Sequence, residues 1–325
     1  MSHHPPKSRP GPITPVAFPY PDIIPPLIIT RSGKCAVCIH PPIPKSIYCL
    51  RCQDIVTSTD HEKLPRRNAA IAAYILSEDA FHCALFHVPL NLEDPYNPYY
   101  RNFVETFPGI HSNQLMVSAL ASMLKSDLTA DELVTVVPAL ADHHFHGTPF
   151  LRDIIPFAAW NRGIPFKPRR LAPFTPPFKA TGYTCEVCIR PRDVGAHYCP
   201  RCRRLIRSGH RYSFVEKKAG LKRNYIQEFD GFLCELTGNL LNEDNPHDPW
   251  FLVYDHIKPG KKELAPAAFW ANDSKGWLSA DQYWNVIGEY ANHIRTGEPF
   301  DPNIITRQEW KQAILRYKAT GRHIA

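Results

Sequence analysis

The chain repeats one cysteine pattern at a spacing of 150 residues, and this repetition limits the possible folds more than any other feature. Cys-x2-Cys, ten intervening residues and a second Cys-x2-Cys occur at 35–52 and again at 185–202. Matched residues continue beyond the cysteines at offsets of 150 or 151, as far as Phe150 and Phe300. So many matches in the same order indicate an internal duplication in which each copy folds as a similar unit.

Proline-rich segments precede both copies and divide the chain. Of the 325 residues, 33 are proline, and proline removes a backbone donor and fixes φ, so such segments form irregular connectors. We therefore expect a lead at 1–34, a first repeat at 35–150, a connector at 151–184 and a second repeat at 185–325. Two units of this size agree with the usual length of a domain.

The ends of both repeats carry helix signals. Thr129-Ala-Asp-Glu and Ser279-Ala-Asp-Gln have the form of a capping box, and apolar residues follow each at helical spacing. Thr306 begins a similar signal near the end of the chain. We expect an α+β fold of tandem duplicated zinc-binding units, each a small β-hairpin packed on helices, in a pseudo-twofold arrangement.

Eight of the ten cysteines have the spacing of zinc ligands. Zinc prefers four tetrahedral thiolates, and each Cys-x2-Cys pair places two of them on one tight turn. We predict two structural Zn²⁺ sites, with buried free thiols as the alternative. The predicted ligands are Cys35, Cys38, Cys49 and Cys52 in the first repeat and Cys185, Cys188, Cys199 and Cys202 in the second. Cys83 and Cys234 lack such a partner, which favours burial as small apolar side chains.

The same cysteines indicate a compartment. The first 34 residues contain no apolar signal core, and disulfide frameworks belong to exported proteins. We therefore expect a protein of a reducing intracellular compartment, cytoplasm or nucleus, that is not secreted. No apolar run reaches the roughly 18 residues that cross a bilayer, so a membrane partner is not expected.

Positive charge concentrates in the second repeat. Residues 166–325 carry 25 Lys and Arg against 17 Asp and Glu, whereas residues 1–165 carry 13 against 14. Between 185 and 223 there are eleven basic residues and three acidic ones. Arginine pairs well with phosphate, so we predict nucleic-acid contact here, with a solvated basic face as the alternative. The candidates are Arg201, Arg203, Arg204, Arg207, Arg211, Lys217, Lys218, Lys222 and Arg223.

One short segment of the second repeat resembles a known catalytic motif. Residues 250–260 predict a strand that ends at Asp255 and His256, and Asn272 follows about 16 residues later at the start of a helical pattern. This arrangement resembles the His-Me finger (ββα-metal, HNH-type) nucleases over about 45 residues. The upstream cysteine pairs are similar to those of the phage recombination endonuclease VII branch. In that branch, however, the pairs straddle the Asp-His pair, whereas here both precede it.

The resemblance implies a metal-dependent endonuclease, with DNA the favoured substrate. His256 is the expected general base, because imidazole titrates near neutral pH. Asp255 and, by analogy with the family, Asn272 are the expected ligands of Mg²⁺ or a similar ion, with Asp273 as the spare candidate. Lys275 is a candidate for contact with the scissile phosphate, although its match Lys125 in the first repeat makes a structural role an equal alternative.

The first repeat lacks the three proposed active residues. Their equivalents in the repeat alignment are Val104, Glu105 and Ser122. We therefore expect one active site per chain, in a monomer with an internal pseudo-dimer or in a homodimer. The alternative for the Asp-His pair is a histidine at a strand end whose hydrogen bonds are made within the fold. The alternatives for the whole protein are a non-catalytic zinc protein that binds nucleic acid with a nuclease fold that has lost its activity, and a subunit of a larger assembly.

Overall fold

The computed structural model describes residues 33–56, 63–107, 113–155, 183–208, 213–256 and 263–319. Arg211 and most of the predicted proline-rich lead and connector lie outside these ranges. Among the helices of the described ranges, none combines the length and the apolar character needed to cross a membrane.

The first repeat contains a pair of helices, two hairpins and a second pair of helices, in that order. Its elements are α1 (Leu50–Val56), α2 (Lys63–Ala73), β1 (Tyr74–Ile75), β2 (Ala80–Phe81), β3 (Arg101–Glu105), β4 (Gln114–Ser118), α3 (Ala119–Lys125) and α4 (Ala130–His146), followed by the short helix η2 (Arg152–Ile154). The strands form two antiparallel hairpins, β1–β2 and β3–β4.

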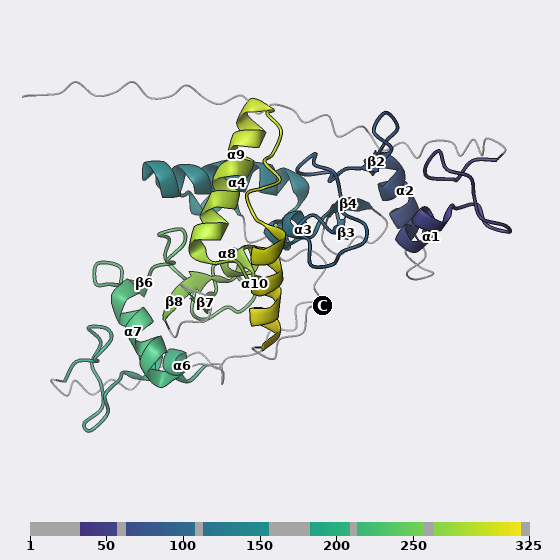
Figure 1. Ribbon diagram of the computed structural model, residues 1–325. Helices are drawn as coiled ribbons and strands as arrows, with labels where there is room; N and C mark the ends of the chain where they lie inside the picture. Colours follow the sequence, from purple (N-terminus) through teal and green to yellow (C-terminus); the bar gives the residue numbers. More distant parts are fainter. Residues whose placement is uncertain are drawn as a thin grey trace, which may run out of the picture.

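The second repeat has the same order of elements (Figure 1). They are α6 (Pro200–Arg207), α7 (Phe214–Asn224), β5 (Tyr225–Ile226), β6 (Gly231–Phe232), β7 (Leu252–His256), β8 (Leu264–Ala268), α8 (Phe269–Lys275) and α9 (Ala280–Thr296), and α10 (Arg307–Ala319) ends the chain. The expectation of a mixed α+β protein with small antiparallel hairpins is confirmed.

The two larger hairpins have the same register. Val104 pairs with Leu115 in the first, and Asp255 pairs with Ala265 in the second. The leading strands therefore match at an offset of 151 and the returning strands at 150. The one-residue difference lies in the connecting loop, where it leaves the side-chain alternation of the strands intact.

The long helices begin where the capping boxes predict. Thr129 and Ser279 each accept a hydrogen bond from the backbone amide of the third helical residue, and the side chain of that residue accepts one from the cap amide. Gly147 and Gly297 end these helices with φ of 69° and 72°, a left-handed conformation that favours glycine. Each helix thus has a fixed start and a fixed end.

The two repeats share one core. Figure 1 shows α9 crossing α4, and these two helices make the most extensive contact between the repeats. Phe86 stacks on Phe300 at a centroid distance of 4.3 Å and meets the edge of Tyr290 at 4.7 Å. All three rings are buried, so they anchor a loop of the first repeat in the second.

Contacts between the repeats occur in equivalent pairs. Met123 lies against Gly276, and the matching residues Asp273 and Ser126 are hydrogen-bonded. His87 lies 5.5 Å from His293 between ring centroids, and its match Gly238 lies against His143. In a third pair, Arg295 donates to the Pro138 carbonyl, and the matching residues Phe145 and Gly288 are in contact. Such reciprocal contacts are those of an isologous interface.

Gly276 offers a test of this interface. Its φ is +55°, and a Cβ there would lie 2.4 Å from the Met123 sulfur. We expect G276A to lower the free energy of unfolding by about 2–3 kcal/mol, because it adds a steric clash to the strain of a positive φ. Urea unfolding measures this loss.

The control is G147A, whose residue also has a positive φ but has open space around its Cβ position. We expect a loss of about 1 kcal/mol for this variant. Equal losses for the two variants would contradict close packing between α3 and α8.

Candidate metal and nucleic-acid sites

The eight predicted zinc ligands form two buried clusters. Cys35, Cys38, Cys49 and Cys52 place their sulfurs within 4.8 Å of one another, and so do Cys185, Cys188, Cys199 and Cys202. The shortest separations run from 3.4 to 3.6 Å. A tetrahedral ion with Zn–S bonds near 2.3 Å sets its sulfurs about 3.8 Å apart, whereas a disulfide needs about 2.05 Å. Both clusters could therefore bind zinc.

Backbone amides orient the sulfurs. In the first cluster, the Val37 amide donates to Cys35 Sγ at 3.4 Å and the Cys52 amide to Cys49 Sγ at 3.5 Å. The same donors recur in the second cluster. Burial raises the pKa of Cys38 to about 12, so this thiol needs a cation before it ionises at neutral pH. These features fit a divalent cation at each cluster.

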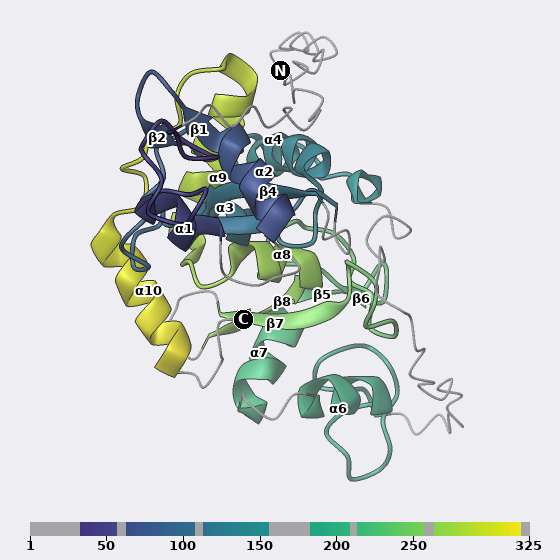
Figure 2. The same ribbon diagram turned by 90° about the vertical axis from the view of Figure 1, so that its right-hand side faces the viewer.

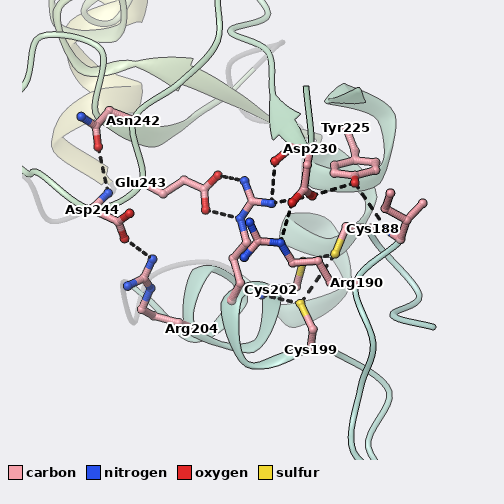
Figure 3. Close-up of polar contacts among 12 residues, drawn as sticks. Cys188, Arg190, Cys199, Cys202, Arg204, Tyr225, Asp230, Asn242, Glu243 and Asp244 are labelled. Atoms are coloured by element: carbon pink, nitrogen blue, oxygen red, sulfur yellow. Dashed lines mark hydrogen bonds and ion pairs between the residues drawn. The ribbon is translucent and has the colours of Figure 1, made fainter. Parts of the chain in front are cut away.

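An aspartate clamps each cysteine module to the neighbouring hairpin. We define the cysteine modules as residues 33–56 and 183–208. Asp230 accepts from Arg190, Arg201 and the Tyr225 hydroxyl (Figure 3). Burial raises the pKa of Asp230, but its hydrogen bonds with Arg190 and Tyr225 outweigh that effect and lower it overall. The carboxylate therefore stays ionised and joins the module to the β5–β6 turn.

The first repeat has the same clamp at Asp79, which accepts from the Tyr74 hydroxyl, His40 and Arg51. The Tyr74 hydroxyl is the main cause of the lowered pKa of Asp79. Sequence reasoning assigned no role to this aspartate. Asp79 and Asp230 are matched residues of the two repeats, and that match was the available signal.

Arg201 has a contact with Glu243 that Arg51, its counterpart in the first repeat, cannot make. Its guanidinium donates to both carboxylate oxygens of Glu243, and the two side chains are 9% and 8% exposed. Its Nε and Nη2 face Glu243, and its Nη1 donates to Asp230. At the position equivalent to Glu243, the first repeat has Leu92. Arg201 is thus a buried structural residue, and the prediction that it contacts nucleic acid does not agree with this placement.

Several other basic residues of the second repeat also have partners within the protein. Lys217 is buried and donates to the carbonyls of Ile206 and Ser208 at the end of α6. The remaining pairs are Arg203 with Asp193, Arg204 with Asp244, Lys218 with Glu186, and Arg223 with Glu235. Arg207 and Lys222 are exposed, and no ion pair joins either one to another residue of the described ranges.

The charge count over residues 185–223 leaves out the acidic residues that follow in the sequence. Residues 224–256 carry seven acidic residues and no Lys or Arg, and the fold brings several of those acids onto the preceding basic segment. Residues 185–256 together carry eleven basic against ten acidic residues, or +1. Acids that follow in the sequence therefore offset part of the positive charge of residues 185–223.

The strand end of β7 brings two of the predicted active residues to α8. Asp255 is buried, and its Oδ1 lies 3.1 Å from the Lys275 ammonium, which is 3.3 Å from the His256 carbonyl. Burial raises the pKa of the Asp255 carboxyl, and Lys275 opposes that rise. Lys275 is 2% exposed. It faces the carboxylate instead of solvent, which favours the structural alternative over a surface contact with phosphate.

The other two candidates lie on α8 with different neighbours. Asn272 precedes Lys275 by three residues and so shares its helix face. Asp273, the spare ligand candidate, accepts from Ser126 of the first repeat, away from β7. Asp255 and His256 at the β7 end and Asn272 on α8 therefore remain as the candidate residues. Carboxylate and amide oxygens are the hard ligands that Mg²⁺ takes from proteins.

The first repeat preserves the lysine without its partner. Lys125 is 2% exposed at the end of α3, where Val104 replaces the aspartate. Burial lowers the pKa of Lys125 to about 8. The buried lysine thus occurs in both repeats, whereas the carboxylate that pairs with it occurs in one.

Comparison with known proteins gives no relative: no family model, no curated protein and no solved structure matches the chain.

Zinc content tests the two clusters separately. We expect two zinc ions per chain in the purified protein, and one in either C52S or C202S, because each substitution removes one of four thiolates. Elemental analysis of each protein gives the count. C83A serves as the control, since Cys83 is buried outside both clusters, and it should retain both ions. Two ions in both serine variants would contradict the assignment.

The Arg201–Glu243 pair gives a second prediction. We expect R201A to lower the free energy of unfolding by about 3 kcal/mol, because it leaves the buried Glu243 carboxylate without its cation. R51A is the matched control in the first repeat, where Leu92 needs no counter-ion, and we expect a loss of about 1 kcal/mol. Urea unfolding of the zinc-loaded proteins compares them, and equal losses would contradict the asymmetry.

Proposed function

We propose that this protein is a metal-dependent endonuclease that hydrolyses phosphodiester bonds, with DNA as the favoured substrate. The observation that carries the proposal is the order of β7, β8 and α8 around the Asp255–His256 pair. A hairpin followed directly by a helix packed against it is the arrangement that the resemblance to His-Me finger nucleases implies. The helix supplies Asn272 and Lys275 on one face.

His256 acts as the general base in this proposal. It ends β7 and is half-buried, whereas Asp255 before it is buried, so the two side chains leave the strand on opposite sides. His256 takes the proton of the attacking water, a task for which imidazole is suited at neutral pH. Lys275 holds Asp255 from the side of the core and also holds the backbone of His256, so it fixes the end of the strand.

A divalent cation such as Mg²⁺, held by Asp255 and Asn272, would neutralise charge on the phosphate and on the leaving oxygen. The two cysteine clusters each hold one structural Zn²⁺ in this proposal. They lie at opposite ends of the molecule, far from each other (Figures 1 and 2), with α1 in one module and α6 in the other. Their role is to fix the modules, since four thiolates leave no open coordination position for chemistry.

The repeats form an internal pseudo-dimer with one active half. The reciprocal contacts of α3 with α8 and of α4 with α9 support this arrangement. With Val104 and Glu105 at the equivalent positions of the first hairpin, one chain has one candidate site. A single chain would therefore cut one strand, and a double-strand break would need a second event or a second chain.

A non-catalytic role as a zinc-containing binding or assembly subunit is the second candidate. The ion pair of Asp255 with Lys275 favours it, because the ammonium already neutralises the buried carboxylate without a divalent cation. The acidic partners of the basic residues in the second cysteine module are compatible with it as well.

Cleavage of plasmid DNA and of RNA in the presence of Mg²⁺ tests the proposal. We expect H256A to cut at least about a hundredfold more slowly than the wild type, because the general base is removed, and to bind the substrate as before. E105A changes the equivalent residue of the first hairpin and should cut at the wild-type rate. Cleavage that survives H256A, or binding by the wild type without cleavage, would favour the second candidate.

A further inference from the structure

Helix α7 lies along the hairpin that carries the candidate site. Figures 1 and 2 show α7 beside β7 and β8, and α7 has its main contact with β8. The approach is closest at Gly220, where a Cβ would lie 2.4 Å from the Leu264 carbonyl oxygen. Leu264 is the residue that pairs with His256 across the hairpin. The C-terminal half of α7 is therefore one strand away from the proposed general base.

That half of the helix ends in two exposed basic residues, Lys222 and Arg223. Arg223 Nη2 lies 3.4 Å from the Leu264 carbonyl oxygen. Because Leu264 pairs with His256, the guanidinium meets the hairpin at the residue opposite the candidate base. Lys222 precedes Arg223 on the same turn.

The first repeat shows what this helix looks like beside a hairpin without the Asp-His pair. There α2 lies against β4 as α7 lies against β8. At the positions of Lys222 and Arg223, however, the first repeat has Ile71 and Ala72. The packing is the same in both repeats, but the two positive charges occur only beside the hairpin that carries Asp255 and His256.

An ion pair within the protein accounts for Arg223 but not for Lys222. Arg223 lies 3.5 Å from Glu235, and the first repeat has Ala84 in place of that glutamate. The two side chains are 47% and 37% exposed, so water screens the pair and either side chain can leave it at little cost. The pair gives no reason for Lys222.

We infer that Lys222 and Arg223 hold the phosphodiester backbone of the substrate beside His256. The nucleic acid then follows α7 along the hairpin instead of crossing the second cysteine module, where Arg201 and Arg204 are paired with acids. Arginine binds phosphate through two parallel hydrogen bonds, and lysine adds a point charge. This inference rests on the proposed function for the position of His256, but its test does not need catalysis.

The test is the salt dependence of binding to a short labelled DNA duplex and to a labelled single strand, by fluorescence anisotropy without Mg²⁺. Each phosphate contact contributes about one to the slope of log K against log salt concentration. We expect K222A/R223A to lower the slope by about 2 and to weaken binding to all sequences alike. The matched control R203A/R204A also removes two charges, and its slope should stay near that of the wild type.

The single variant E235A distinguishes phosphate binding by Arg223 from its ion pair with Glu235. If the arginine only served its pair with Glu235, E235A would weaken binding as much as the loss of the arginine does. If the arginine holds phosphate, E235A should bind at least as tightly as the wild type, because it removes a competing carboxylate.

Three outcomes would overturn the inference. In the first, the wild-type protein binds neither the duplex nor the single strand. In the second, the salt slope of R203A/R204A falls as far as that of K222A/R223A. In the third, polyglutamate competes for binding as strongly as unlabelled DNA does. The last would point to an acidic protein partner. Binding with the expected slopes but without cleavage would overturn the proposed nuclease and leave this inference standing.

Discussion

Each cysteine cluster brings four buried sulfurs from two chain turns to within 4.8 Å of one another, and the surrounding module has few other buried apolar side chains. Short segments of this kind need a cross-link, because their own core is too small to offset the loss of chain entropy. Asp79 and Asp230 extend the constraint from the clusters to the adjacent hairpins. In both repeats, therefore, four sulfurs shape the module and one carboxylate joins it to the adjacent hairpin.

Substitutions in the shared core and at the hairpin ends have different consequences. Residues at the contact of α4 with α9, and the rings around Phe86, pack against both repeats. β7 contacts α8, and its hairpin partner β8 contacts α7, so the residues around the end of β7 belong to the second repeat. This separation explains how one hairpin can carry Asp255 and His256 while its partner carries Val104 and Glu105 on the same backbone.

The buried pair of Asp255 and Lys275 is the least expected feature of the candidate site. A buried ion pair often gives little net stability, because both charges lose water, but removal of one member is costly. In the first repeat Lys125 keeps the buried position after the carboxylate is replaced. A lysine retained without its partner is consistent with a first hairpin that once carried the same pair.

Local signals in the sequence determined much of this structure. The capping boxes at Thr129 and Ser279 and the Cys-x2-Cys turns depend on residues a few positions apart, and all of these features occur where the sequence predicts them. Asp255, His256 and Asn272 could be singled out as candidates for the same reason, since a strand end and a helix start are local features.

Tertiary structure alone decided where the charges went. Arg201 pairs with Glu243 and Lys275 with Asp255, partners that are 42 and 20 residues away along the chain. Charge counted over a segment cannot reveal such partners, because opposite charges from another segment cancel it only after folding. The same argument applies to Arg223, which meets the residue paired with His256 only because α7 packs on β8. The sequence determined which groups the protein has, and the fold decided which of them neutralise one another and which stay exposed.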